Sequence, residues 1–145
     1  MVTCEETCRN YPIGEHAAHC PGKNENMKIK IPFIGYSTNK IYAGIHWTKR
    51  KRQADEAHLI VKLSCAKMKQ IDNLADLEFT PYVSTRRLDT SNYSASCKMI
   101  EDGLVACGVL KGDGQKHVGR IIINPPVKLK HGDQSYMIVE ITEVK

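Results

Sequence analysis

The sequence predicts an α+β protein, with a small mixed sheet of about four strands covered on one face by two helices. Four short segments are apolar or alternate apolar with polar residues, which is typical of strands. Two longer segments carry apolar residues at intervals of three and four, which is typical of amphipathic helices. The connections between these segments are short, and a sheet with helices packed on one face buries a common core for such a mixture.

Residues 1–26 differ in composition from the rest, and we expect the folded domain to occupy residues 27–145. The first segment holds three of the six cysteines and two histidines, with no apolar periodicity. We interpret it as a flexible extension. The alternative is a small zinc site, because four Cys or His ligands suffice for tetrahedral zinc, although the usual Cys-x2-Cys spacing is absent. Its candidate ligands are Cys4, Cys8, His16 and Cys20.

The first half of the domain predicts one strand and one helix. Residues 27–33 alternate lysine or proline with apolar residues, which indicates a strand with one buried face. Polar residues and glycines at 35–44 predict a loop. From residue 47 to about residue 68 the apolar residues recur at helical spacing, which predicts the first helix.

The second half predicts three more strands and a second helix. Residues 77–85 predict the second strand, which leads into the helix. Residues 118–124 contain three consecutive isoleucines and predict a third, largely buried strand. Residues 136–144 alternate again and predict the last strand.

The segment from Arg86 to Asp113 contains the second helix and organises the chain. Thr90, Ser91 and Asn92 are candidate N-caps, because each side chain can accept a hydrogen bond from a free backbone N–H. Gly108 is the expected left-handed residue beyond the helix end.

Three acids and one lysine lie in or beside this helix. Lys98 and Asp102 are four residues apart and share one face. Asp89 precedes the helix and Asp113 follows it, and a helix of about 15 residues is roughly 22 Å long. The two flanking acids can meet the others only if the chain folds back after the helix, or if a neighbouring strand carries Asp89 toward Asp102. Taken singly, these residues are also typical of a cap, a solvated ion pair and a turn.

The composition suggests a cytoplasmic protein. No apolar run approaches 18 residues, so we expect no membrane span, and the first residues lack the apolar core of a signal peptide. Cysteines without such a signal indicate reduced thiols, and Cys65, Cys97 and Cys107 fit buried small apolar residues. The formal net charge of +5 suits a polyanionic partner, although many unrelated proteins share it.

The order of motifs in the central segment resembles the RusA-type Holliday junction resolvases of phages and prophages. The matching residues are Leu88-Asp89 with Asn92, then Lys98, then Asp102-Gly103-Leu104, then Gly108 and Asp113. The likeness extends to Ile31-Pro32, Ser37, Asn39 and Tyr42, and to the closing strand, so that it covers about residues 27–145. It implies the same α+β fold.

The resemblance implies a homodimeric endonuclease that resolves four-way DNA junctions by paired nicks, in DNA recombination and repair in the cytosol of a bacterial host. Mg²⁺ would be the cofactor, with Mn²⁺ as a substitute. By position, Asp89, Asp102 and Asp113 would hold the metal, and Lys98 would be the active-site lysine. These four residues are the expected catalytic set.

Two departures from the family pattern favour an alternative. Ser91 stands where the family has its second metal-binding acid, and a hydroxyl is a weaker ligand for Mg²⁺ than a carboxylate. Gly112 stands where an acid often precedes the last Asp. Both reduce negative charge, so a catalytically weak or inactive branched-DNA-binding protein is the second hypothesis. A small zinc-linked interaction protein, suggested by residues 1–26, is the third.

Basic and polar side chains are the expected DNA contacts, since phosphates attract them without sequence preference. The alternative interpretation is an ordinary surface turn and a solvated helix end. The candidates are Asn39, Lys40, Lys49, Arg50, Lys51, Arg52, Arg86 and Arg87.

Overall fold

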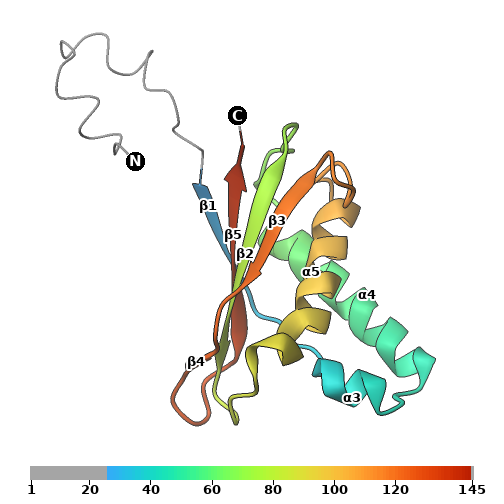
Figure 1. The fold of residues 1–145 in the computed structure, drawn as a ribbon, viewed down its shortest axis with the longest axis vertical. Helices are drawn as coiled ribbons and strands as arrows, with labels where there is room; N and C mark the ends of the chain where they lie inside the picture. The colour runs from blue at the N-terminus through green and yellow to red at the C-terminus, as the bar shows by residue number, and fades with distance from the viewer. Residues whose placement is uncertain (1–25, 145) are drawn as a thin grey trace, which may run out of the picture.

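The computed structural model describes residues 26–144 and has the predicted α+β architecture (Figure 1). The expected extension and its zinc ligands, Cys4, Cys8, His16 and Cys20, lie outside the described residues. The strands are β1 (Asn26–Ile31), β2 (Ala75–Val83), β3 (Val118–Ile123), β4 (Val127–Lys128) and β5 (Tyr136–Glu143). The helices are α3 (Thr38–Tyr42), α4 (Trp47–Ser64) and α5 (Ser94–Ala106), with a 3-10 turn, η1 (Thr90–Tyr93), before α5.

The sheet is mixed, and its central strand pair is antiparallel. The strand order is β1-β5-β2-β3, with the short β4 pairing beside β2. Strand β5 runs antiparallel to both β1 and β2, whereas β3 and β4 run parallel to β2. The parallel pair needs a crossover, and α5 supplies it. Described residues therefore form five strands and three helices, one more of each than predicted.

The core lies between one face of the sheet and the pair α4 and α5, which Figure 1 shows on the same side of the sheet. Burial alternates strictly along β2, so that Leu77 and Phe79 face the helices and are fully buried. From the helices, Val61 of α4 and Leu104 of α5 are also fully buried. Gly103 permits this packing, because a Cβ at that position would lie 3.1 Å from the Val61 side chain.

Strand β3 corrects the expectation of a largely buried strand. Only Val118 is buried, while Ile121 and Ile122 are 47% and 43% exposed. The reason is its place in the sheet: among the described strands β3 pairs only with β2, so one edge is open. Consecutive isoleucines indicate strand propensity, but they do not specify how many neighbours cover the strand.

The predicted loop at residues 35–44 contains the short helix α3, which is built onto the start of α5. The Ser37 hydroxyl caps α3 by accepting from the backbone N–H of Lys40. Thr38 Oγ1 lies 2.8 Å from Ser94 Oγ and accepts from the Ala95 N–H at 3.2 Å. The Asn39 N–H donates to the buried Asn92 Oδ1 at 3.2 Å.

This contact also corrects the expected N-caps of α5. Thr90, Ser91 and Asn92 lie in η1, and the cap position is Tyr93, whose side chain makes no capping bond. A threonine from another element supplies the acceptor instead. At the other end, Gly108 has a φ of +83°, as expected for the residue that ends the helix. Helix α4 ends at Ser64, earlier than the expected residue 68.

Within residues 26–144, no helix combines the length and the apolar character that a membrane crossing requires.

Candidate active site

Helix α5 presents Lys98 to three carboxylates. Its Nζ atom lies 3.0 Å from Asp102 Oδ1, one turn along the helix, and 3.2 Å from Asp113 Oδ2. Glu101 Oε1 is 3.7 Å away. We call these four residues the Lys98 cluster. It unites three of the four predicted catalytic residues and adds one glutamate.

Asp113 reaches the cluster because the chain reverses after α5. The backbone N–H groups of Val109 and Leu110 both donate to the Leu104 carbonyl, which closes the helix end. Leu110 then bridges to Ile71 and is buried. The following residues return along α5 and carry Asp113 back to Lys98. The reversal of the chain after the helix, which Asp113 needs in order to reach Lys98, is therefore present.

Charge pairing dominates the electrostatics of the Lys98 cluster. The hydrogen bond to Asp102, with further contributions from Asp113 and Glu101, raises the pKa of Lys98 above its ordinary value. In return, Lys98 lowers the pKa of Asp113, which is solvent-exposed. Lysine is thus held as a cation and Asp113 as an anion across the neutral pH range.

Glu101 behaves differently because it is buried. Desolvation of its carboxyl raises its pKa, although the nearby Lys98 opposes that shift. Its carboxyl nevertheless lies 3.7 Å from the ammonium of the exposed Lys98. The sequence contained the clue, since residues three apart on a helix are neighbours, but only the pair four apart was considered.

Asp89 does not contact the Lys98 cluster. It occupies the cap position of η1, where its backbone carbonyl accepts from the Asn92 N–H at 2.9 Å. Its side chain makes no capping bond and is exposed. A role for Asp89 beside the cluster stays a prediction, because no contact among residues 26–144 brings the two together.

The two departures from the family pattern have different surroundings. Ser91 is exposed in η1, and its carbonyl accepts from Ser94 Oγ at 2.8 Å. Gly112 lies against His117, and a Cβ at this position would come within 2.9 Å of the His117 ring. Ser91 has room for a longer side chain, whereas Gly112 has room only if His117 moves.

The donor chemistry of the cluster suits Mg²⁺. Carboxylate oxygens are its preferred protein ligands, and it is commonly held by one or two carboxylates together with waters and substrate phosphates. Asp102 and Asp113 provide two such groups on one exposed surface. Within the described residues, no three His, Cys, Asp or Glu side chains form a ready-made metal site. A metal here would therefore need waters or phosphate oxygens as additional ligands.

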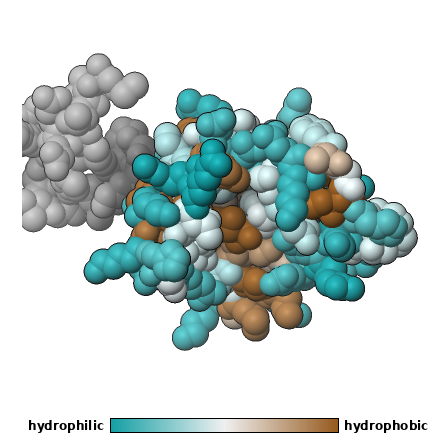
Figure 2. Space-filling model, turned by 90° about the horizontal axis from the view of Figure 1, so that it is seen from below, coloured by the Kyte–Doolittle hydropathy of each residue, from teal (hydrophilic) through white to brown (hydrophobic). Residues whose placement is uncertain are grey.

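All eight expected DNA contacts are exposed, including Asn39, Arg86 and Arg87. Lys49, Arg50 and Arg52 project from the first turns of α4, and Lys51 pairs with Asp55 at 3.1 Å. Lys40 in α3 lies over the Tyr36 ring, 4.9 Å from its centroid. Seen from the end of the molecule opposite the marked C-terminus, hydrophilic side chains surround a few apolar ones (Figure 2).

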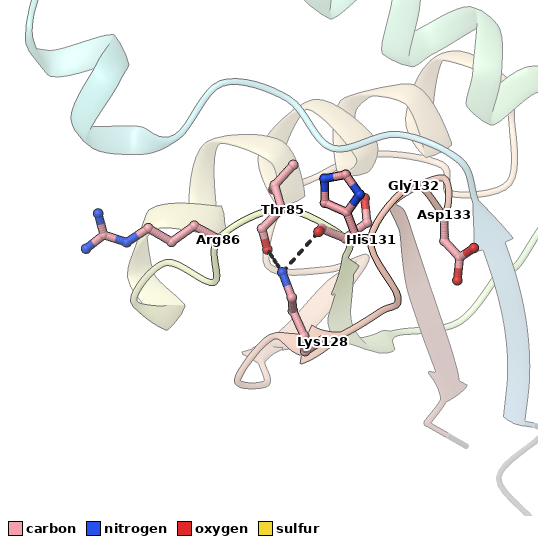
Figure 3. A pocket seen from close by; sticks show the side chains of 7 residues that line it. Thr85, Arg86, Lys128, His131, Gly132 and Asp133 are labelled. Carbon is pink, nitrogen blue, oxygen red and sulfur yellow. Dashed lines mark hydrogen bonds between the residues drawn. The ribbon is translucent and has the colours of Figure 1, made fainter.

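A second basic surface surrounds a hollow of about 540 Å³ at the end of β2. Lys128 donates to the carbonyls of Ser84 and Thr85 at 3.0 and 2.6 Å, which ties β4 to the end of β2 (Figure 3). Arg86 and Asp133 extend away from each other on its two sides. The lining is Ser84, Thr85, Arg86, Lys128, His131, Gly132 and Asp133. Sequence analysis singled out Arg86 here but not His131.

No protein-family model matches the chain, and no curated protein matches it.

Proposed function

We propose that this protein is an Mg²⁺-dependent endonuclease that resolves four-way DNA junctions by paired nicks. The observation that carries the proposal is the Lys98 cluster, in which one ammonium and the carboxylates of Asp102 and Asp113 share an exposed surface. Metal-assisted phosphodiester hydrolysis uses both kinds of group. Carboxylates hold the metal ion, and a nearby ammonium neutralises negative charge on the phosphate. The motif order around these residues, which resembles the RusA-type resolvases, supports the same activity.

Each residue has a distinct role in this proposal. Asp102 and Asp113 hold the metal ion, and Asp89 joins them when DNA is bound. Bound Mg²⁺ supplies a more nucleophilic water and neutralises charge on the phosphate. Lys98 then exchanges one of its carboxylate partners for a phosphate oxygen and orients the scissile group. Glu101, 3.7 Å from the ammonium, adds a third carboxyl beside Lys98.

Two basic surfaces would bind the arms of the junction. The first turns of α4 carry Lys49, Arg50 and Arg52, and the hollow beside Arg86 carries Lys128 and His131. Contacts of this kind follow the phosphate backbone and give salt-dependent affinity without sequence preference. Neutralising Lys49, Arg50 and Arg52 together should therefore flatten the dependence of junction affinity on salt. An unchanged slope would remove α4 from the interface.

A homodimer in the bacterial cytoplasm is part of the proposal. A four-way junction has near two-fold symmetry, and two symmetric nicks need two active sites related in the same way. Analytical ultracentrifugation at micromolar concentration tests this directly. A protein that is monomeric both when free and when bound to the junction would contradict paired cleavage.

A second candidate is a protein that binds branched DNA without cutting it. Two observations favour it: Ser91 places a neutral hydroxyl where an acid is expected, and Asp89 does not contact the Lys98 cluster. Both weaken the hold on a metal ion. The fold and the basic surfaces would serve such a binder equally well.

One experiment separates the two candidates. A labelled synthetic four-way junction is incubated with the protein in Mg²⁺, in Mn²⁺ and in EDTA, with linear duplex of the same sequence as the control. Metal-dependent nicks at symmetric positions support the nuclease. A gel shift of the junction with no nicks in either metal supports the binder, and no preference for the junction over duplex contradicts both.

A further inference from the structure

The corner between α3 and α4 exposes aromatic rings. Tyr42 is 84% exposed and Trp47 is 61% exposed. The His46 ring is stacked beside the Trp47 indole, with centroids 5.8 Å apart and an angle of 30° between the planes. We call Tyr42, His46 and Trp47 the aromatic corner. Large exposed rings leave apolar surface in water, which makes them candidates for contact with a ligand.

The charge around the aromatic corner has a single sign. Between Pro32 and Ala54 the sequence contains five lysines and arginines and no Asp or Glu. Of these, Lys51 pairs with Asp55, whereas Lys49, Arg50 and Arg52 form no ion pair within the described residues. A ligand that fits this surface combines negative charge with flat rings.

The corner is also firmly attached to the body of the protein. The His46 ring accepts from the Thr48 N–H at the start of α4, and the Tyr36 N–H donates to Gln53 Oε1 at 2.7 Å. On the other side, Thr38 and Asn39 are hydrogen-bonded to the start of α5. The backbone that carries the rings is therefore already ordered before a ligand arrives, which lowers the entropy lost on binding.

We infer that the aromatic corner binds unpaired bases of single-stranded DNA, with Tyr42 and Trp47 stacking on bases and the α4 cations contacting the adjacent phosphates. Stacking of bases on aromatic side chains beside a basic groove is the usual basis of sequence-tolerant single-strand binding. Paired bases are already stacked on one another, so a duplex would use the cations but not the rings. This inference rests on the proposed function, from which DNA is taken as the ligand. It adds that the substrate contains unpaired nucleotides near the branch.

The chain carries its own reporter for this contact, because Trp47 is its only tryptophan. We would titrate the protein with an oligo(dT) strand of about 12 nucleotides, within the range that one binding module covers, in EDTA and low salt. The expected result is quenching of Trp47 fluorescence by oligo(dT) and weaker quenching by a duplex of equal length. Equal quenching by the duplex, or by polyglutamate, would overturn the inference, because either would mean that charge alone is recognised.

Variants provide the second arm. Tyr42→Ala and Trp47→Leu should each weaken binding of a fluorescein-labelled oligo(dT), measured by anisotropy, by roughly 5- to 150-fold. Leu63→Ala is the matched control, since Leu63 is 70% exposed, between the values for Trp47 and Tyr42, and lies at the other end of α4. Circular dichroism checks that each variant is folded. We expect both to fold, because Tyr42 and Trp47 are exposed. Wild-type affinity in both ring variants would overturn the stacking role.

The outcome is separable from that of the junction assay. Neither measurement here requires Mg²⁺ or cleavage, so oligo(dT) stacking without nicking would contradict the nuclease and retain this site. Junction cleavage without Trp47 quenching would support the nuclease and contradict the single-strand site.

Discussion

The Lys98 ammonium lies 3.2 Å from the Asp113 carboxylate, although fifteen positions separate the two residues. The contact exists because the chain reverses after Gly108 and returns along α5. It joins a residue on the helix to one in the loop beyond it, and this is the arrangement on which the proposed chemistry depends.

Replacing Asp113 by Asn should lower the cleavage rate of a four-way junction by at least about 100-fold, because a charge that holds the metal ion is removed. Asp89→Asn should do the same if this residue joins the site on DNA. Gel-shift affinity for the junction should be unchanged in both.

The matched control is Asp72→Asn, which removes an exposed acid that pairs with Lys111 outside the cluster. This variant should cut normally. If Asp113→Asn cuts at the wild-type rate, Asp113 does not hold the metal.

Ser91→Asp should increase cleavage at low Mg²⁺ concentration, because a carboxylate is a stronger ligand than a hydroxyl. We expect a gain of at least about 10-fold in apparent metal affinity, since even groups that only hydrogen-bond to a metal ligand have effects of this size. Cleavage rates measured over a series of Mg²⁺ concentrations provide the test. Thr90→Asp adds the same charge one residue away and serves as the control; equal gains in both would point to general attraction rather than ligation.

Glu101→Gln should change how stability depends on pH. Burial raises the pKa of Glu101 in the folded state, so the folded protein binds this proton more tightly than the unfolded chain. Wild-type stability should therefore decrease as pH rises from the ordinary glutamate pKa through the raised one. The Gln variant lacks this loss, so its free energy of unfolding relative to the wild type should increase between pH 4 and pH 8. Urea titrations at several pH values measure it, and a constant difference would contradict a raised pKa.

Cys97 should resist alkylation in the folded protein. Burial raises its pKa from 9.0 to about 12, which lowers the thiolate fraction about 1000-fold at neutral pH. Cys65, with a pKa raised to about 11 by burial, should also react slowly. Iodoacetamide labelling followed by peptide mass spectrometry would give the rate at each thiol. Labelling of Cys97 as fast in buffer as in urea would show that it is not protected by burial.

Gly103→Val should destabilise the protein by about 1–3 kcal/mol, the usual cost of overpacking, because the new side chain would meet Val61. Gly114→Ala is the control, since a Cβ there meets nothing within 4 Å; its effect should stay within about 0.5 kcal/mol. Chemical denaturation compares the two.

Local patterns predicted the fold well for the strands that alternate apolar with polar residues and bury one face. The alternation in β1, β2 and β5 matches their burial. The same reasoning was wrong for Ile121 and Ile122, because exposure at a sheet edge depends on strand order, which no local pattern contains. Thr38 was missed as the acceptor for the start of α5 for the same reason, since the two residues in that bond are far apart in sequence.

The candidate site was predictable in part. The spacing of Lys98 and Asp102 follows from helix geometry, and Gly108 indicated where the chain could turn. Glu101 was overlooked because only the pair four residues apart was considered, and its burial by the packing of α5 is not visible in the local pattern. Among the four predicted catalytic residues, Asp89 is the one that makes no contact with the others in the part of the chain that the structure describes.

The contact between Gly103 and Val61 has a mechanical consequence. The two helices pack closely at this glycine, and closely packed interiors resist relative motion, so α4 and α5 should move as one rigid piece. The aromatic corner at the start of α4 and the carboxylates on α5 would then keep a constant separation. A nuclease with this geometry would cut at a set number of nucleotides from the branch, whatever the sequence between them.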